Sequence, residues 1–199
     1  MKPLLQSIRL LLVLTVITGA VYPALVTVLS KSMFPRQSAG SLVVRDRQVV
    51  GSALLGQRTT SEAYFWPRPS AGDDGTNYVA VPSSASNKGP TSADWITSVQ
   101  QRSAAIRTAR GMSTNRAVPA DLVLASGSGL DPHISPDAAR LQLDRVARTR
   151  GLNPEQRNTL TQLVEAKVES PTLGVLGEPR VNVLLLNLAL DETFPTARR

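Results

Sequence analysis

The chain has 199 residues, a formal net charge of +7, one histidine and no cysteine. The lack of cysteine excludes disulfides, thiol chemistry and thiolate zinc sites, and a single histidine excludes a multi-histidine metal site within one chain. The positive charges are spread along the sequence, with no lysine- and arginine-rich block and no basic stripe interleaved with aromatic residues. Nucleic-acid binding is therefore disfavoured.

An uncharged apolar run occupies residues 10–29, after a short N-terminal segment at 1–9. A helix needs about 20 such residues to cross the hydrocarbon core of a bilayer. A cleaved signal peptide is the alternative, but the apolar run continues past every small-residue cleavage position and is longer than a usual signal-peptide core. We therefore predict a transmembrane helix at 10–29, kinked at Pro23, with threonine hydroxyls bonded back to its own backbone.

The orientation of this helix is less strongly encoded. Lys2 and Arg9 precede the run, and Lys31 and Arg36 follow it, so the positive charges on its two sides are nearly balanced. A long domain that follows a membrane helix translocates largely regardless of its own charge. The preferred orientation has the N-terminus inside and the domain outside.

A connector at 30–40 leads into a soluble domain at 41–199. Apolar residues at 42–44 and 49–50 flank four polar residues, a pattern that predicts a β-hairpin. The segment Tyr64-Phe65-Trp66-Pro67-Arg68-Pro69 contains two prolines, which exclude a central strand or a helix interior. It is interpreted as an extended segment that fixes aromatic side chains in a small core, with a partner-docking surface as the alternative. Residues 70–90 have no periodicity and are predicted to form a long loop.

Helices dominate the rest of the chain. One is predicted at 94–109, after a cap at Thr91 or Ser92. A second is predicted at 136–150 and a third from the cap residue Asn153, while 121–125 is predicted to be a short strand or a buried extended piece. The segment 181–190 is either a strand buried on both faces or a strand that leads into a helix turn. The residues expected on the apolar faces of the three helices are, in chain order, Trp95, Val99 and Ile106; Ala139, Leu143, Val146 and Ala147; and Leu160, Leu163, Val164 and Val168. Arg140, Arg145 and Arg148 are expected off the apolar face of the second helix.

These patterns predict a fold class of one transmembrane helix followed by one mixed α/β domain, with several helices and a small sheet.

Residues 125–136 contain the residue types of a nucleophilic hydrolase, because Ser126, Ser128, Asp131 and His133 lie close together. However, the serines lack the G-x-S-x-G pattern of a nucleophile elbow. A single proline separates Asp131 from His133, so we do not expect a preset hydrogen bond between their side chains. The favoured interpretation is a connector in which Gly127 and Gly129 adopt positive φ, Asp131 forms an Asx-turn and Ser135 caps a helix.

The sequence resembles the C-subunit family of the Kdp-type potassium-transporting ATPase, with the motifs of that family in the same order along the chain. The resemblance is carried by the apolar helix and by a series of short motifs that covers nearly the whole chain. The motifs lie at 51–52, 55–57, 64–66, 68–69, 126–136, Gln142 with 145–147, 177–179, 181–183 and 186–191.

The resemblance implies a non-catalytic, single-pass protein of the bacterial inner membrane, with a cytoplasmic N-terminus and a periplasmic domain. Its implied partners are a channel-like potassium-translocating subunit, a P-type ATP-hydrolysing subunit, a small single-helix subunit and membrane lipid. The chain lacks the D-K-T-G-T phosphorylation sequence and a carbonyl selectivity-filter motif, as expected for an accessory subunit.

The C subunit of this family is described as a catalytic chaperone that raises the ATP affinity of the pump subunit and supports assembly of the complex. ATP would be shared with that subunit, and Gln142 matches the position linked to nucleotide contact. The alternative is an extracytoplasmic binding module that organises potassium entry without contacting ATP. No catalytic or metal-ligating residue is predicted. The residues predicted to contact partners are Tyr64, Phe65, Trp66, Arg68, Asp131, His133 and Arg145.

Overall fold

The computed structural model describes residues 2–70, 85–110 and 112–195. The chain divides into two compact units, Met1–Ser52 and Ala53–Arg199. Residues 71–84, most of the predicted loop at 70–90, lie outside the described residues.

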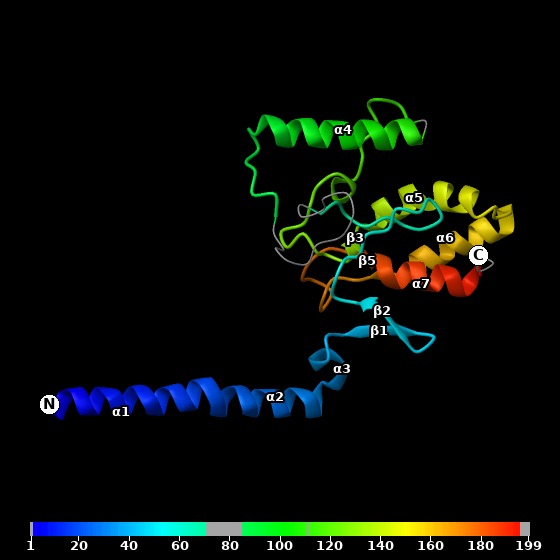
Figure 1. Cartoon of the computed structure of the whole chain (residues 1–199). Coiled ribbons are helices and arrows are strands. Elements are labelled where there is room, and N and C mark those ends of the chain that lie inside the picture. The colour runs from blue at the N-terminus through cyan, green and yellow to red at the C-terminus, as the bar shows by residue number, and fades with distance from the viewer. Residues whose placement is uncertain (1, 71–84, 111, 196–199) are drawn as a thin grey trace. The chain divides into compact units, whose positions relative to one another are not determined.

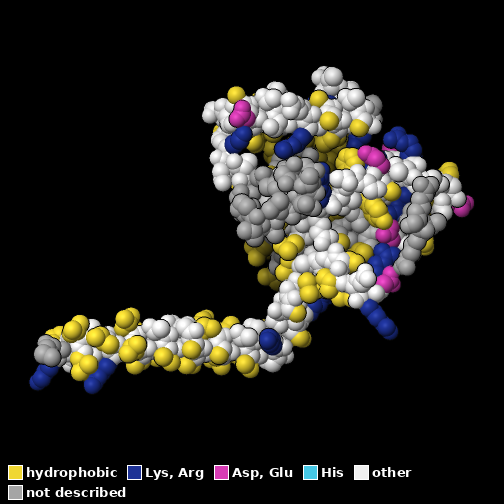
Figure 2. Space-filling model, viewed as in Figure 1, with side chains coloured by type: hydrophobic (Ala, Val, Ile, Leu, Met, Phe, Trp, Pro, Cys, Tyr) yellow, Lys and Arg dark blue, Asp and Glu magenta, His cyan; other side chains and the backbone are white. Residues whose placement is uncertain are grey.

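The first unit begins with a continuous helix that is long and apolar enough to cross a membrane. It consists of α1 (Lys2–Val16), a π-helical turn (Ile17–Val21) and α2 (Tyr22–Met33). The whole helix has 32 residues and extends beyond the predicted span at both ends. Figure 2 shows hydrophobic side chains along its length, with Lys and Arg side chains at its two ends.

The π-helical turn lies directly before Pro23 and has a physical cause. A proline inside a helix has no N–H to donate, and its ring collides with the carbonyl group one turn earlier. The wider π turn places an extra residue in that position, so the helix continues through the proline. As predicted, Thr18 and Thr27 donate their hydroxyl hydrogens to backbone carbonyls one turn earlier, both at 2.7 Å.

The predicted hairpin follows the short helix α3 (Pro35–Ser38), which lies inside the expected connector. Its strands are β1 (Leu42–Arg45) and β2 (Gln48–Ser52), paired antiparallel. Asp46 and Arg47 between them both have positive φ, of 51° and 63°. This is the backbone of a type I′ turn, which matches the twist of the two strands.

The second unit contains four helices and a three-stranded antiparallel sheet of order β3-β5-β4 within its described residues (Figure 1). The helices are α4 (Ala93–Ala109), α5 (Pro136–Thr149), α6 (Pro154–Ala166) and α7 (Val183–Thr193), with a 3-10 turn at Ala120–Leu122. The strands are β3 (His133–Ile134), β4 (Val168–Glu169) and β5 (Arg180–Asn182).

The hydrophobic core of this unit lies among α5, α6, α7 and the adjoining strands. Its largest fully buried apolar side chains are Phe65, Ile134, Leu160, Leu186 and Leu190. In contrast, α4 has no buried residue, and its expected apolar face is only half-buried.

Side chains cap the starts of all four helices of the second unit, and three of these caps were predicted. The side chains of Ser92, Ser135 and Asn153 each accept a hydrogen bond from a backbone N–H three residues later. Gln156 completes a capping box by accepting from the N–H of Asn153 at 3.0 Å. The helices predicted from these caps are confirmed.

Three details of the sequence prediction are wrong, and one pair of alternatives is resolved. Residues 121–125 form no strand, because the chain makes a 3-10 turn there. Helix α6 ends at Ala166, so Val168 belongs to β4 and not to the helix. Of the two alternatives predicted for 181–190, the strand that leads into a helix is the one found, since Asn182 ends β5 and its side chain caps α7. Arg145 does not lie off the buried face of α5, because only 5% of it is exposed.

The loop between β4 and β5 ends in a compact apolar turn at residues 171–177, which we call the hairpin tip. Thr172 and Leu176 form an isolated antiparallel bridge at its base, with both N–H···O distances at 2.9 Å. Leu173 is 86%, Val175 80% and Leu176 59% exposed. The backbone is well hydrogen-bonded, yet three large apolar side chains point into solvent.

Candidate functional site

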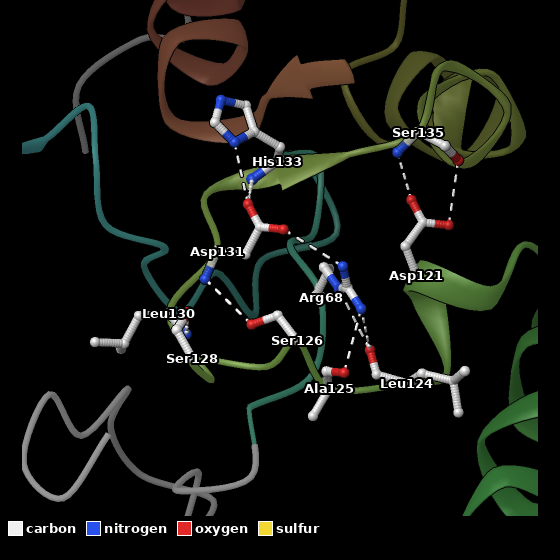
Figure 3. Close-up of polar contacts among 10 residues, drawn as sticks. All are labelled: Arg68, Asp121, Leu124, Ala125, Ser126, Ser128, Leu130, Asp131, His133 and Ser135. Carbon is white, nitrogen blue, oxygen red and sulfur yellow. Dashed lines mark hydrogen bonds and ion pairs between the residues drawn. The ribbon is translucent and has the colours of Figure 1, made fainter. Parts of the chain in front are cut away.

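Asp131 and His133 form a side-chain pair, contrary to the prediction. Nδ1 of His133 lies 3.0 Å from Oδ1 of Asp131, which also accepts the backbone N–H of His133 at 3.0 Å (Figure 3). This second bond is the predicted Asx-turn. Across the turn, Nη1 of Arg68 lies 3.3 Å from Oδ2 of Asp131. The hydrogen bond from His133, partly opposed by burial, lowers the pKa of the Asp131 carboxyl.

The serines of this stretch are not arranged for nucleophilic attack. Oγ of Ser126 accepts from the N–H of Asp131, and Oγ of Ser128 accepts from the N–H of Leu130. In Figure 3 the imidazole of His133 points away from both serines, with Asp131 between them. The hydroxyl groups support the loop backbone, as the connector interpretation predicts.

The rest of the connector is also held by local polar contacts. Gly129 has a φ of +72°, as predicted, whereas Gly127 is not among the residues with positive φ. Arg68 donates to the carbonyls of Leu124 and Ala125, and Asp121 accepts from both the N–H and the hydroxyl of Ser135. The stretch is thereby fixed on both sides before α5 begins.

The aromatic segment is held by two side-chain amides from helices. Asn187 of α7 accepts the N–H of Phe65 at 2.8 Å and donates to its carbonyl at 2.9 Å. Gln142 of α5 does the same for Trp66, accepting at 2.8 Å and donating at 3.1 Å. Each amide pairs with the backbone as a neighbouring strand would. The segment is extended and its central ring is fully buried, as predicted.

Arg145 is the buried centre of these contacts. Its guanidinium donates to the carbonyls of Glu62 and Tyr64 and to Oε1 of Gln142. It also lies 4.0 Å from the centroid of the Trp66 ring, a cation–π arrangement. Burial lowers the pKa of Arg145 to about 10, although the nearby Glu62 opposes this shift.

Arg150 makes a second, parallel set of contacts at the end of α5. It donates to the carbonyls of Ala63 and Phe194 at 2.8 and 2.9 Å and pairs with Asp191 at 2.7 Å. Its guanidinium lies 4.7 Å from the centre of the Tyr64 ring, and the Tyr64 hydroxyl donates to Asp191. Burial, followed by this hydrogen bond to Asp191, raises the pKa of Tyr64.

The sequence prediction did not include Arg150, Asn187 or Asp191. Asn187 could have been found from the sequence, because it is an asparagine inside an otherwise apolar segment and a buried amide requires hydrogen-bond partners. Arg150 gave no such signal, since an arginine at a helix end is ordinarily explained by the helix dipole.

The structure separates the predicted site residues into two groups. Phe65, Gln142 and Arg145 are buried, and the side chains of Gln142 and Arg145 form hydrogen bonds within the chain. The half-buried residues are Tyr64, Trp66, Arg68, Asp131 and His133. Among the described residues there is no cluster of His, Cys, Asp and Glu that could hold a metal ion.

Comparison with known proteins gives matches along the whole chain. The family model described as KdpC, the c chain of K+-transporting ATPase, matches residues 4–192. A potassium-transporting ATPase KdpC subunit from Geobacter sulfurreducens is 46% identical over 196 residues, covering 98% of this chain and 100% of the relative. The corresponding subunit from Rhodospirillum rubrum is 49% identical over 197 residues, with 99% of each chain covered. The similarity includes both the apolar helix and the domain.

Proposed function

Because this chain belongs to the KdpC family, the c chains of K+-transporting ATPases, we propose that it is a non-catalytic accessory subunit that supports assembly of the transport complex. The observation that carries this proposal is the internal use of its buried polar side chains. Gln142, Arg145 and Arg150 are all bonded to the chain's own backbone. Groups used in this way hold a surface in shape and are not free to act on a substrate.

An effect on ATP affinity is part of this proposal, as an indirect effect. Gln142 has no exposed surface, and both atoms of its amide are hydrogen-bonded to Trp66. A nucleotide could reach that amide only by breaking two buried hydrogen bonds, each of which would leave an unsatisfied backbone group. We therefore assign the effect to contact with the ATP-hydrolysing subunit or its neighbours, and not to nucleotide held by this chain.

The hairpin tip is the surface that best supports contact with another subunit. Its three exposed apolar side chains stand on a turn whose backbone is already hydrogen-bonded, so little conformational entropy is lost on docking. Leu173 keeps a φ of 56°, a conformation uncommon for leucine. Strain of this kind is typical of positions where a turn serves a binding role.

Replacing Leu173 and Leu176 together with asparagine is expected to reduce co-purification of the ATP-hydrolysing subunit from detergent-solubilised membranes by about tenfold or more, since two buried apolar contacts would be lost. Asparagine tolerates positive φ, so the turn itself should survive at position 173. Ile96→Asn, an exposed position on α4, is the matched control and should leave recovery unchanged.

The same preparations test the accessory role. Potassium-stimulated ATPase activity should fall, and the ATP concentration for half-maximal activity should rise, when the chain is deleted. Purification of this chain alone, together with ATPase activity indifferent to its deletion, would show that the assignment is wrong. If the Ile96→Asn control also lost co-purification of the ATP-hydrolysing subunit, the hairpin tip would no longer be supported as the docking surface.

We further propose that the N-terminus is cytoplasmic and that residues 53–199 lie outside the cytoplasm. Added protease is therefore expected to digest the domain in intact spheroplasts and to leave it protected in inverted membrane vesicles. The physical reason is that long domains cross the membrane largely regardless of their charge. Immunoblotting with antibodies against the domain makes the comparison, and the opposite pattern would reverse the orientation.

A further inference from the structure

A groove of about 840 Å³ lies beside the buried Arg145, between the end of α4, residues 112–121 and the outer face of α5. Both positive and negative side chains line it, but the positive charges are in excess. The charged residues are Arg110, Arg116, Arg140, Arg145, Arg148, Asp121, Asp137 and Asp144.

The carboxylates of the groove are already committed to other groups. Asp121 accepts two hydrogen bonds from Ser135, and Asp144 pairs with Arg157 of α6. Asp137 pairs with Arg140, which is also held by Glu165 at 2.7 Å. Asp137 and Asp144 are therefore each paired with an arginine, whereas Asp121 receives hydrogen bonds only from the neutral groups of Ser135. Because five arginines and three aspartates line the groove, its net charge remains positive.

Three of the arginines that line the groove have no ion-pair partner among the residues that the structure describes. Along the described residues, the guanidinium groups of Arg110, Arg116 and Arg148 make no hydrogen bond or ion pair. Arg110 is half-buried, and burial lowers its pKa, with Glu62 and Asp144 acting on it only through their charge. An arginine that is partly desolvated and unpaired is energetically unfavourable until an anion approaches.

Arg145 also lines the groove, and it adds its positive charge there although its hydrogen bonds are made within the chain. Only 4% of its side chain is exposed, and its Nε is a buried donor without a hydrogen-bond partner. Oε2 of Glu62 lies 3.6 Å from this Nε, which is within ion-pair distance but beyond hydrogen-bond distance. The charges of Arg110 and Arg148 act on Arg145 as well, so the three guanidinium groups form one positively charged cluster.

We propose that this groove binds a phosphate group, supplied either by free phosphate or by the headgroup of an anionic phospholipid. The planar fork of each guanidinium matches pairs of phosphate oxygens, and a phosphate offers more acceptor oxygens to a cluster of arginines than a carboxylate does. The groove is large enough for a phosphate that carries an organic substituent.

The test uses the full chain in detergent and compares the Arg110→Gln/Arg148→Gln double variant with wild type. Arg180→Gln is the matched control, because it removes one arginine that pairs with Glu169 away from the groove. Thermal unfolding is followed in sodium phosphate and in sodium chloride at equal ionic strength. Phosphate stabilises most proteins without binding to a site, so the informative quantity is the difference among the three proteins.

Wild type and Arg180→Gln are expected to share a saturable stabilisation by phosphate, with an apparent Kd about tenfold or more tighter than that of the double variant. Native mass spectrometry after incubation with phosphatidylglycerol or phosphatidylcholine distinguishes the two sources. Preferential retention of phosphatidylglycerol by wild type identifies a lipid headgroup, and phosphate stabilisation without that preference identifies free phosphate.

Equal responses to phosphate in all three proteins, with no preference for phosphatidylglycerol, would overturn the proposal. The exposed single variant Arg148→Gln provides the same comparison if the double variant does not fold. It should still bind phosphate more weakly than Arg180→Gln, and equal binding by the two would also contradict the site.

Discussion

Replacing Arg145 with methionine is expected to lower the free energy of unfolding by about 3–5 kcal/mol. Methionine fills most of the volume but donates no hydrogen bond. The carbonyls of Glu62 and Tyr64 and one bond to Gln142 would lose their donor, and each buried acceptor left unsatisfied costs about 1–3 kcal/mol. Chemical denaturation of the detergent-solubilised protein, followed by tryptophan fluorescence, measures this change.

Arg148→Met provides the control for this experiment, because it makes the same change on the same helix at an exposed position. Its effect on stability should remain within about 0.5 kcal/mol, as for most surface substitutions. Equal losses in the two variants would mean that the buried hydrogen bonds of Arg145 contribute nothing beyond removal of a positive charge.

Replacing Phe65 with alanine is expected to destabilise the second unit by about 3–5 kcal/mol, the usual cost of a large cavity in a packed core. Phe65 is fully buried among residues of α5, α6 and α7. For a chain of this size the loss corresponds to a fall in melting temperature of roughly 10 °C. Differential scanning fluorimetry of the full chain gives the comparison.

The matched control for Phe65→Ala is Leu176→Ala, which truncates a large apolar side chain that is 59% exposed. The melting temperature of the control should remain within about 2 °C of wild type, because little apolar area leaves the interior. If Phe65→Ala melted like this control, the aromatic segment would not be part of the core.

The sequence predicts the elements whose signals are local. The caps Ser135 and Asn153 act on N–H groups only three residues away, so the starts of α5 and α6 can be read directly. The hairpin of the first unit follows from two apolar runs and the polar turn between them. The apolar helix is equally clear in composition, although its ends at Lys2 and Met33 lie beyond the uncharged run.

The burial of Arg145 was wrongly predicted because it depends on contacts between distant residues. Arg145 looks like a surface residue until segment 62–66 is placed beside it, because its acceptors are carbonyls more than 80 residues away. The apolar run after Asn182 has no helical period of its own, because α7 is packed on most of its sides. The Asp131–His133 pair depends on the Asx-turn, because the same Oδ1 of Asp131 that accepts the N–H of His133 also lies beside Nδ1 of its ring.

Within the aromatic segment, the amides of Gln142 and Asn187 form their hydrogen bonds with backbone groups. The route of the main chain at residues 65 and 66 is therefore specified from α5 and α7, independently of which side chains stand at those two positions. A substitution at 65 or 66 alters what the segment presents to its surroundings, whereas a substitution at 142 or 187 releases the segment itself. The path of the backbone and the side chains that it carries are thus determined by residues in different parts of the chain.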